Sequence, residues 1–395
     1  MNVYDAVFYL PSLGPVISKP EGPVPFGGAE TQIWMLAQGL AQSGRTVAVV
    51  VSDTPTGVPS RIDGIDIVAR PAWEPGGGIR GKVVELVTLW RALGSVDTNV
   101  VVQRNAGLWT GLVGGMTRLR RRRFVYSSAH VSDFTFEALP LSTTEIRLFK
   151  LGIRLADLIV VQTDEQASLC RERFGRSSFV IKSIAEPADL RAGTPEAFLW
   201  IGRLVSYKRP AAFLELARAL PEARFRLVGV PAPDQPEIQR EVEREAQELP
   251  NVELLSTRSR PELLGLYDHA VAVVSTSESE GMPNVFLEGW SRGVPALALS
   301  HDPDGVIESW RLGGFARGSR TGLASLAREI WSTKDDQAAL SARCRDYVER
   351  EHGLATAVAR WSAALGLNGA RQLPERRSNG AMDAAVTSGV QSAER

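Results

Sequence analysis

The chain of 395 residues carries 45 basic and 45 acidic side chains, so its net charge gives no indication of bulk nucleic-acid binding, and we expect no nucleic-acid partner. Its length suits two domains of ordinary size. Its two cysteines, Cys170 and Cys344, lie far apart in helix-like contexts, which argues against a disulfide framework and favours a reducing compartment. No apolar run reaches the roughly 18 residues that span a bilayer, and the first residues do not resemble a signal peptide, so we expect a cytoplasmic protein.

The first part of the chain alternates strands with helices. Residues 3–10 predict a strand and residues 30–42 a helix. Between them lies a glycine- and proline-rich loop at 11–28, whose length favours a functional role. It ends in Gly27 and Gly28, which would let a ligand approach the backbone closely, although helix capping explains the pair equally well. Further strands are predicted at residues 46–52, 65–69, 99–103, 124–127 and 157–162, and helices at residues 82–93 and 143–155.

Two polar residues follow predicted strands. Arg104 comes after the strand at 99–103, and His130 comes after the strand at 124–127. Ligands of open α/β sheets gather at the carboxyl ends of the strands, which makes both residues candidates for a site. The competing interpretations are a surface arginine and a structural histidine.

A run of five arginines between Arg118 and Arg123 is interrupted only by Leu119. Such a run is usually the solvated end of a helix, and this is the interpretation we favour. Alternatively, the run attracts anionic lipid head groups and brings the protein to the inner membrane face as a peripheral protein. That contact would also require exposed apolar anchors.

The second half begins after a loop-like linker at 181–194. A strand at 198–201 leads into Gly202-Arg203-Leu204-Val205-Ser206-Tyr207-Lys208. Two cations on a loop just past a strand end suit a diphosphate, because Arg203 can form a fork with one phosphate and Lys208 can place a point charge on the other. Further strands are predicted at 224–228 and 252–255, and helices ending at residue 220 and at 237–248 and 261–268.

Residues 270–299 predict a buried strand, a loop, a helix and a second buried strand. Pro283 suits the first helical position, and Gly293 ends the helix. Asp302-Pro303-Asp304 follows, and we interpret it as a turn rather than a metal site. Helices are predicted from residue 321 to residue 350 and at 354–365, and the tail from residue 368 is predicted to be disordered.

The loop before the helix at 283–292 combines an anion site with two carboxylates. Gly281 permits close approach of a ligand, and the N–H groups of Asn284 and Val285 lie at the positive end of the helix dipole. Glu280 and Glu288 would repel phosphate, so we expect them to bind sugar hydroxyl groups. On spacing alone, a solvated Glu280 and a surface Glu288 explain the pattern equally well.

These motifs resemble those of a known enzyme family. Glu280 and Glu288, with seven residues between them, resemble the E-x7-E signature of retaining glycosyltransferases of the GT-B fold, most closely glycosyltransferase family 4. The stretch from Gly202 to Lys208 is similar to the family's G-R-L-x-x-x-K element. The chain departs from the family at three places. Met282 and Pro283 replace a phenylalanine and a glycine, Arg209 replaces a glycine after the lysine, and Val131 and Ser132 separate His130 from Asp133.

The resemblance implies a role for each candidate. Glu280 would contact the donor sugar and Glu288 the ribose, with His130 beside them in the catalytic site. Gly27 and Gly28 would face the donor diphosphate, and Arg104 is a further candidate. The remaining donor-binding residues would be Arg203, Lys208, Gly281, Met282, Asn284 and Val285.

The resemblance also implies an α/β fold with two Rossmann-like, doubly wound parallel-sheet domains that face each other across a cleft. We expect an acceptor domain at 1–182, a donor domain at 183–352, a helix at 353–367 that packs back on the first domain, and the tail at 368–395. The expected function is retaining, metal-independent and cofactor-independent transfer of a sugar from a nucleotide-diphosphate sugar, as in polysaccharide biosynthesis. The acceptor would be a glycan, a lipid-linked saccharide or a small metabolite. The alternatives are a non-catalytic nucleotide-sugar-binding protein and a GT-B sugar-nucleotide epimerase.

Overall fold

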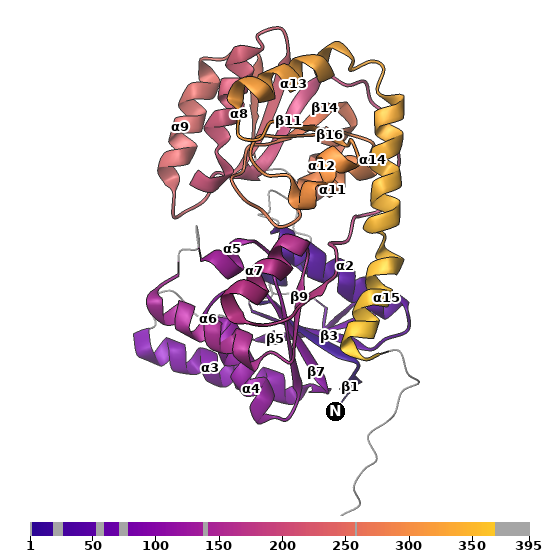
Figure 1. The fold of residues 1–395 in the computed structure, drawn as a ribbon. Helices are drawn as coiled ribbons and strands as arrows, with labels where there is room; N and C mark the ends of the chain where they lie inside the picture. The colour runs from indigo at the N-terminus through magenta and orange to yellow at the C-terminus, as the bar shows by residue number, and fades with distance from the viewer. Residues whose placement is uncertain are drawn as a thin grey trace, which may run out of the picture.

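The computed structural model describes residues 2–18, 27–52, 59–70, 78–136, 141–256 and 259–367. Two parallel sheets, each covered by helices, lie one above the other, and the C-terminal helices run along one side of both (Figure 1). The predicted α/β fold with two Rossmann-like domains is confirmed. The predicted tail at 368–395, residues 19–26 of the predicted loop, and positions 257 and 258 lie outside the described residues. Residues 11–18 of that loop form two short helices, which the sequence did not predict.

The N-terminal sheet has eight strands in the order β10-β9-β8-β7-β2-β3-β5-β4, and only the β4–β5 pair is antiparallel. The strands of this sheet and the separate β1–β6 pair are β1 (Val3–Tyr4), β2 (Ala6–Tyr9), β3 (Val47–Ser52), β4 (Arg61–Ile62), β5 (Ile65–Arg70), β6 (Asp97–Thr98), β7 (Val100–Arg104), β8 (Arg123–Ser127), β9 (Leu158–Val161) and β10 (Phe179–Val180). The helices are η1 (Pro11–Leu13), α1 (Gly14–Ser18), α2 (Gly28–Gln42), α3 (Gly78–Ser95), α4 (Leu108–Leu119), α5 (Ser132–Thr135), α6 (Thr143–Leu155) and α7 (Asp164–Phe174).

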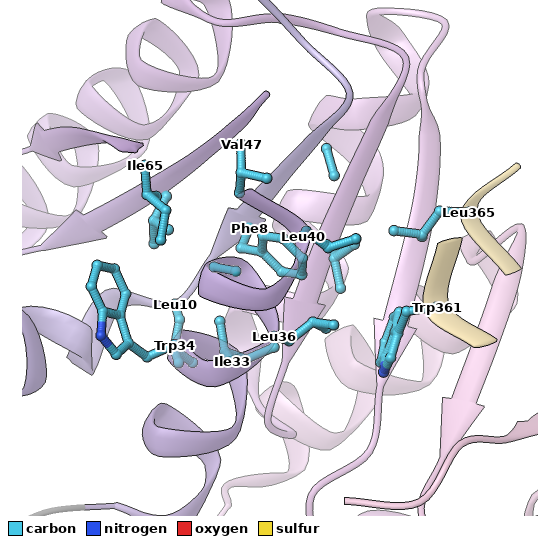
Figure 2. Close-up of a cluster of buried hydrophobic side chains, with 14 of the residues drawn as sticks. Phe8, Leu10, Ile33, Trp34, Leu36, Leu40, Val47, Ile65, Trp361 and Leu365 are labelled. Carbon is cyan, nitrogen blue, oxygen red and sulfur yellow. The ribbon is translucent and has the colours of Figure 1, made fainter. Parts of the chain in front are cut away.

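The buried strands of this sheet send alternate side chains to opposite faces, as a sheet covered on both sides requires. Phe8 packs in the core that α2 covers, whereas Tyr9 packs in the core on the other face. The last helix, α15 (Leu354–Leu365), also belongs to the first core. Its Trp361 and Leu365 lie beside α2 and the strands (Figure 2), so α15 packs against the N-terminal domain.

The C-terminal sheet has six parallel strands in the order β13-β12-β11-β14-β15-β16. They are β11 (Ala197–Arg203), β12 (Arg224–Val230), β13 (Val252–Leu255), β14 (Ala270–Ser275), β15 (Ala296–Ala298) and β16 (Gly313–Phe315). The helices are η2 (Ser206–Lys208), α8 (Pro210–Ala219), α9 (Pro236–Gln247), α10 (Arg260–Gly265), η3 (Leu266–His269), α11 (Asn284–Ser291), η4 (Pro303–Gly305), α12 (Val306–Ser309), α13 (Arg320–Ser332), α14 (Ala338–Glu351) and α15.

Two local predictions are wrong in ways that affect the site. Arg203 was expected on a loop, but β11 and β12 remain paired through Gly202 and Arg203, so Arg203 is the last residue of its strand. Pro283 was expected at the first helical position, but its ψ of 122° is extended, and it is the N-cap of α11. The helix therefore begins with Asn284.

The turn at Asp302-Pro303-Asp304 joins the two domains. The Asp304 carboxylate accepts hydrogen bonds from the N–H groups of Asp164 and Glu165 at the start of α7, at 3.0 and 3.2 Å. It thus satisfies amide groups at the positive end of a helix in the other domain. Across the described ranges, no helix combines the length and apolar composition that crossing a bilayer requires.

The arginine run bridges elements of the N-terminal domain. Arg118 forms an ion pair with Asp157 at 2.9 Å. Arg122 donates to backbone carbonyl groups at the end of α3, and Arg123 donates to a carbonyl group of α15. The expected solvated helix end is therefore only part of the description, because several of these side chains tie neighbouring elements together.

Candidate active site

A cleft of about 510 Å³ lies between the two domains, where the carboxyl ends of both sheets face each other. This is the edge at which parallel α/β sheets bind ligands. All the residues predicted for the site line this cleft, although they come from distant parts of the chain. They are Gly27, Gly28, Arg104, His130, Arg203, Lys208, Glu280, Gly281, Met282, Asn284, Val285 and Glu288.

Lys208 and Glu280 form an ion pair at the centre of the cleft. Burial opposes the charge on Lys208, but the adjacent Glu280 outweighs it and raises the pKa of Lys208. Burial likewise opposes the charge on Glu280, but Lys208 and then His130 lower the pKa of this carboxyl group. Glu280 is therefore a buried, ionised carboxylate, which excludes the interpretation that it is solvated.

Buried hydrogen bonds bring the Glu280 loop next to η2. The indole N–H of Trp200 donates to Thr276 Oγ1 at 3.0 Å, and the Thr276 hydroxyl donates to the backbone oxygen of Lys208 at 2.7 Å. The N–H of Glu278 donates to the carbonyl group of Tyr207 at 2.9 Å. These contacts fix the spacing between the cation and the carboxylate.

His130 reaches the same carboxylate from the N-terminal domain. Its Nδ1 accepts the N–H of Ser132 at 3.0 Å, so Nε2 carries the ring proton and donates to the carbonyl oxygen of Ser279 at 3.0 Å. The same Nε2 lies 3.8 Å from Glu280 Oε2. The ring also packs edge-on against Tyr207, with the ring centroids 5.5 Å apart. His130 therefore spans the cleft.

Asp133 holds the His130 loop in place. Its Oδ2 accepts the N–H of Ala129 at 2.8 Å and the hydroxyl groups of Tyr126 and Ser128 at 2.9 and 3.0 Å. The two-residue insertion between His130 and Asp133 thus leaves the aspartate as a structural partner of the strand end.

The backbone N–H groups around the start of α11 differ in whether they already have a hydrogen-bond acceptor. The N–H of Met282 donates to Gln162 Oε1 at 3.1 Å, so this amide already has a partner in the N-terminal domain. Among the described residues, no acceptor is found for the N–H groups of Asn284 and Val285. Pro283 provides no side-chain cap, so these two amides remain the anion-binding donors of the helix start.

Gly281 and Gly28 lie close to atoms of the facing domain and also line the cleft. A Cβ on Gly281 would lie 2.9 Å from the carbonyl oxygen of Ala129, and one on Gly28 would lie 2.9 Å from Asn284 Nδ2. Asn284 Nδ2 also donates to the carbonyl oxygen of Gly28 at 3.0 Å. Close approach of a ligand to these glycines stays a prediction.

Glu288 is buried in α11, so the interpretation that it is a surface residue is wrong. Arg260 donates to its Oε1 at 2.6 Å, and the Tyr267 hydroxyl donates to its Oε2 at 2.5 Å. Arg260 also forms an ion pair with Glu186 of the interdomain linker at 2.9 Å. Although burial opposes its charge, these two carboxylates raise the pKa of Arg260.

The remaining two predicted cations differ in their surroundings. Arg203 is half exposed and lies 3.8 Å from Asp234. Arg104, at the end of β7, is buried, and its Nη1 donates to Ser127 Oγ at 3.0 Å.

Among the cleft residues that were not predicted, three contact predicted ones. Tyr207 lies inside the Gly202–Lys208 motif, and Gln162 follows β9, so the strand-end signal that identified Arg104 and His130 would also have identified Gln162. Arg260 carries no local signal, because its partners Glu288 and Glu186 lie far from it in sequence. In the described ranges, no group of three or more His, Cys, Asp or Glu side chains is arranged to hold a metal ion.

Comparisons with known proteins identify both domains. Residues 26–188 match the model for Glycosyltransferase Family 4, and residues 195–332 match the model for Glycosyl transferases group 1. Among curated proteins, no sequence matches the chain.

Solved structures share the fold at low sequence identity. Sucrose-phosphate synthase from Thermosynechococcus elongatus is 15% identical, with a TM-score of 0.74, and the alignment covers 92% of this chain and 99% of that one. HepE from Anabaena, solved with UDP and glucose, is 15% identical, with a TM-score of 0.72 and the same coverage. The lipopolysaccharide outer core galactosyltransferase WaaB is 15% identical, with a TM-score of 0.62 and again the same coverage. These alignments extend over both domains.

Proposed function

Because the chain is a GT-B glycosyltransferase, we propose that it transfers a sugar from a nucleoside-diphosphate sugar to a hydroxyl acceptor with retention of configuration and without a metal ion. The observation that supports this most is the cluster in which Lys208, Glu280 and His130 meet beside the start of α11. It places a cation, a carboxylate and free amides within one cleft.

The donor diphosphate binds along the C-terminal wall. Lys208 and Arg203 approach it from η2 and β11, and the free N–H groups of Asn284 and Val285 approach it from the start of α11. These groups stabilise the negative charge that grows on the diphosphate as it leaves. Two cations and a helix N-terminus supply the positive charge that balances it, so the proposal requires no metal ion.

The two carboxylates bind the sugar rings of the donor. Glu280 lies next to Lys208, so it can accept hydroxyl groups of the transferred sugar while Lys208 contacts the adjacent phosphate. Glu288 uses one lone pair of each oxygen for Arg260 and Tyr267, which leaves acceptor capacity for the ribose hydroxyl groups. Arg260 and Tyr267 thereby position Glu288.

Transfer proceeds on one face of the sugar. The bond from the anomeric carbon to the phosphate oxygen breaks, and the acceptor oxygen forms its bond on the same face. The leaving phosphate oxygen takes the proton of the acceptor hydroxyl group, so no protein base is needed. His130 orders the loop that carries Glu280 through its bond to Ser279 and contributes to the potential at the carboxylate.

A screen of nucleoside diphosphates and their sugars by thermal shift tests the donor assignment. A ligand at ~100 times its dissociation constant stabilises the folded state by about 2.7 kcal/mol. We expect nucleoside-diphosphate sugars to raise the melting temperature, and Arg203→Gln to weaken this effect. A chain that no nucleotide sugar stabilises would contradict the proposal.

Release of nucleoside diphosphate with a panel of acceptors separates the alternatives. A glycosyltransferase releases diphosphate in proportion to the glycosylated acceptor. An epimerase changes the donor sugar in the absence of an acceptor, and a binding protein does neither. Retention is read from the anomeric configuration of the product by NMR.

We also propose, as part of the same function, that the N-terminal domain contacts an anionic membrane. Eleven lysines and arginines lie on α3, α4, α6 and the 120–123 turn, against two glutamates, in a chain with no net charge. On α3, Val83, Val84 and Val87 are 53%, 57% and 41% exposed, and the guanidinium of Arg120 lies 3.9 Å from the ring centre of Trp90. Exposed apolar groups beside a basic surface favour peripheral binding.

Sedimentation with vesicles tests this surface. We expect binding to vesicles of phosphatidylglycerol but not of phosphatidylcholine, and loss of binding in Val84→Asp. Leu254→Asp, which changes an exposed apolar residue of the C-terminal domain, is the matched control. Equal binding of the two vesicle types would contradict a basic docking surface.

A further inference from the structure

Arg104 is a buried cation without a carboxylate partner. It is the last residue of β7, is 6% exposed and lines the cleft from the N-terminal domain. Its Nη1 donates to Ser127 Oγ, whereas, among the described residues, Nε and Nη2 have no hydrogen-bond acceptor. Buried charges are normally paired, so this arrangement calls for an explanation.

The other cations of the cleft are paired. Lys208 contacts Glu280, Arg260 contacts Glu288 and Glu186, and Arg203 lies 3.8 Å from Asp234. Within the described part of the chain, Arg104 is the cleft-lining arginine or lysine that forms no ion pair. Its charge is therefore available to a ligand.

The two acidic residues whose charges act on Arg104, Asp133 and Glu30, accept hydrogen bonds from other groups and form no ion pair with it. Asp133 accepts three short hydrogen bonds from its own loop and strand, and Glu30 accepts the Ser12 hydroxyl at 2.5 Å. Burial lowers the pKa of Arg104 to about 10, which leaves the guanidinium positively charged at neutral pH. A permanent positive charge thus remains on this wall.

We propose that Arg104 binds an oxyanion, a phosphate or a carboxylate, that belongs to the acceptor. This inference rests on the proposed function, and it names the chemical class of the acceptor. Arg104 lines the cleft without an ion pair, and the one hydrogen bond of its guanidinium among the described residues is that of Nη1 with Ser127, so the group keeps a charge and donor capacity for such an anion. The oxyanion selects and orients the acceptor from the wall opposite the donor cations.

The experiment first fills the donor site. The nucleoside diphosphate that stabilises the chain most is added to saturation, and inorganic phosphate, acetate or glycerol 3-phosphate is then titrated. We expect at least one of these anions to raise the melting temperature further. If none of them does so while the diphosphate itself binds, the inference is overturned and the donor assignment stands. If no diphosphate binds, the proposed function fails first, and an anion shift measured without nucleotide still tests Arg104.

Two variants assign the second shift to this site. Arg104→Gln should abolish the anion-dependent shift and leave the diphosphate-dependent shift unchanged. Asn105→Asp places a carboxylate next to Arg104 at a position whose φ of 78° aspartate tolerates, and it should also abolish the anion shift, even if Arg104→Gln folds poorly. Anion shifts that persist in the folded variants would overturn the assignment. Vesicles with phosphatidic acid, compared with glycerol 3-phosphate, distinguish a lipid head group from a soluble phosphate.

Discussion

The two walls of the cleft balance their charges in different ways. On the C-terminal wall, Lys208 and Arg260 are each matched by a buried carboxylate from α11 or the loop before it. On the N-terminal wall, Arg104 forms no ion pair among the described residues, and His130 is held mainly by backbone groups. A wall with internal pairs is preorganised for one ligand, the donor. A wall with an unpaired charge depends on its ligand to complete the site.

The largest loss should follow Glu280→Gln, which tests the central pair of the C-terminal wall. The amide keeps the size of the side chain but removes the negative charge of the carboxylate that is proposed to bind the donor sugar. We expect the transfer rate to fall about 100-fold or more, as when a preorganised transition-state contact is removed. Nucleoside diphosphate binding, measured by calorimetry, should remain detectable.

The matched control is Glu278→Gln on the same loop. Its side chain is 61% exposed and lies 3.7 Å from Arg209, so it makes only a surface ion pair. Its transfer rate should stay near that of the wild type. An unchanged rate in Glu280→Gln would remove Glu280 from the mechanism.

Lys208→Met should weaken both stability and donor binding. It leaves the buried Glu280 without its cation, which typically costs about 3 kcal/mol of folding free energy. Chemical denaturation should show this loss, and the KM for the donor should rise. The double variant Lys208→Met with Glu280→Leu should recover much of the stability without recovering activity. A single variant as stable as the wild type would show that the ion pair is not important for folding.

Arg260→Gln tests the positioning of Glu288 and should have a smaller effect. Glu288 keeps Tyr267 but loses one donor, so we expect nucleotide affinity to fall about tenfold, or ~1.4 kcal/mol. Arg226→Gln, which breaks ion pairs on the surface of the same domain, is the control. Unchanged affinity would contradict a positioning role.

The smallest effect on catalysis should come from His352, which belongs to the junction between the domains and not to either wall. Its ring nitrogens lie 2.6 Å from the carbonyl oxygen of Ser183 and 3.0 Å from the Tyr347 hydroxyl. Burial lowers its pKa to about 4. In the unfolded chain His352 therefore becomes protonated below about pH 6.5, whereas in the folded chain it becomes protonated only near pH 4.

The free energy of unfolding should be at its full value at neutral pH, and protonation of His352 should lower it by ~3 kcal/mol in total as the pH drops from about 6.5 to about 4. Denaturation curves at pH 7.5 and 4.5 measure the loss, and His352→Gln should reduce the difference between them. The transfer rate at pH 7.5 should remain near that of the wild type. If the variant lost as much stability on acidification as the wild type, another group would be responsible.

Much of the fold was predictable because its signals are local. The buried strands at β3, β7 and β14 are short β-branched runs, and helix ends follow glycine and proline positions. The errors fell at strand and helix ends. Arg203 extends β11 because a neighbouring strand supplies hydrogen-bond partners, and Pro283 is extended because the loop before it packs on the other domain. Neither cause is visible in the segment itself.

The sequence by itself identified twelve of the residues that line the cleft, in part because residues that follow parallel strands reach the same sheet edge wherever they lie in the chain. Only the tertiary structure decided how they pair. Glu280 meets Lys208, 72 residues away, and Glu288 meets Arg260, 28 residues away, while Arg104 meets no carboxylate in the described part of the chain. Such pairs depend on the packing of separate elements to within a few tenths of an ångström, and residue spacing does not encode that distance.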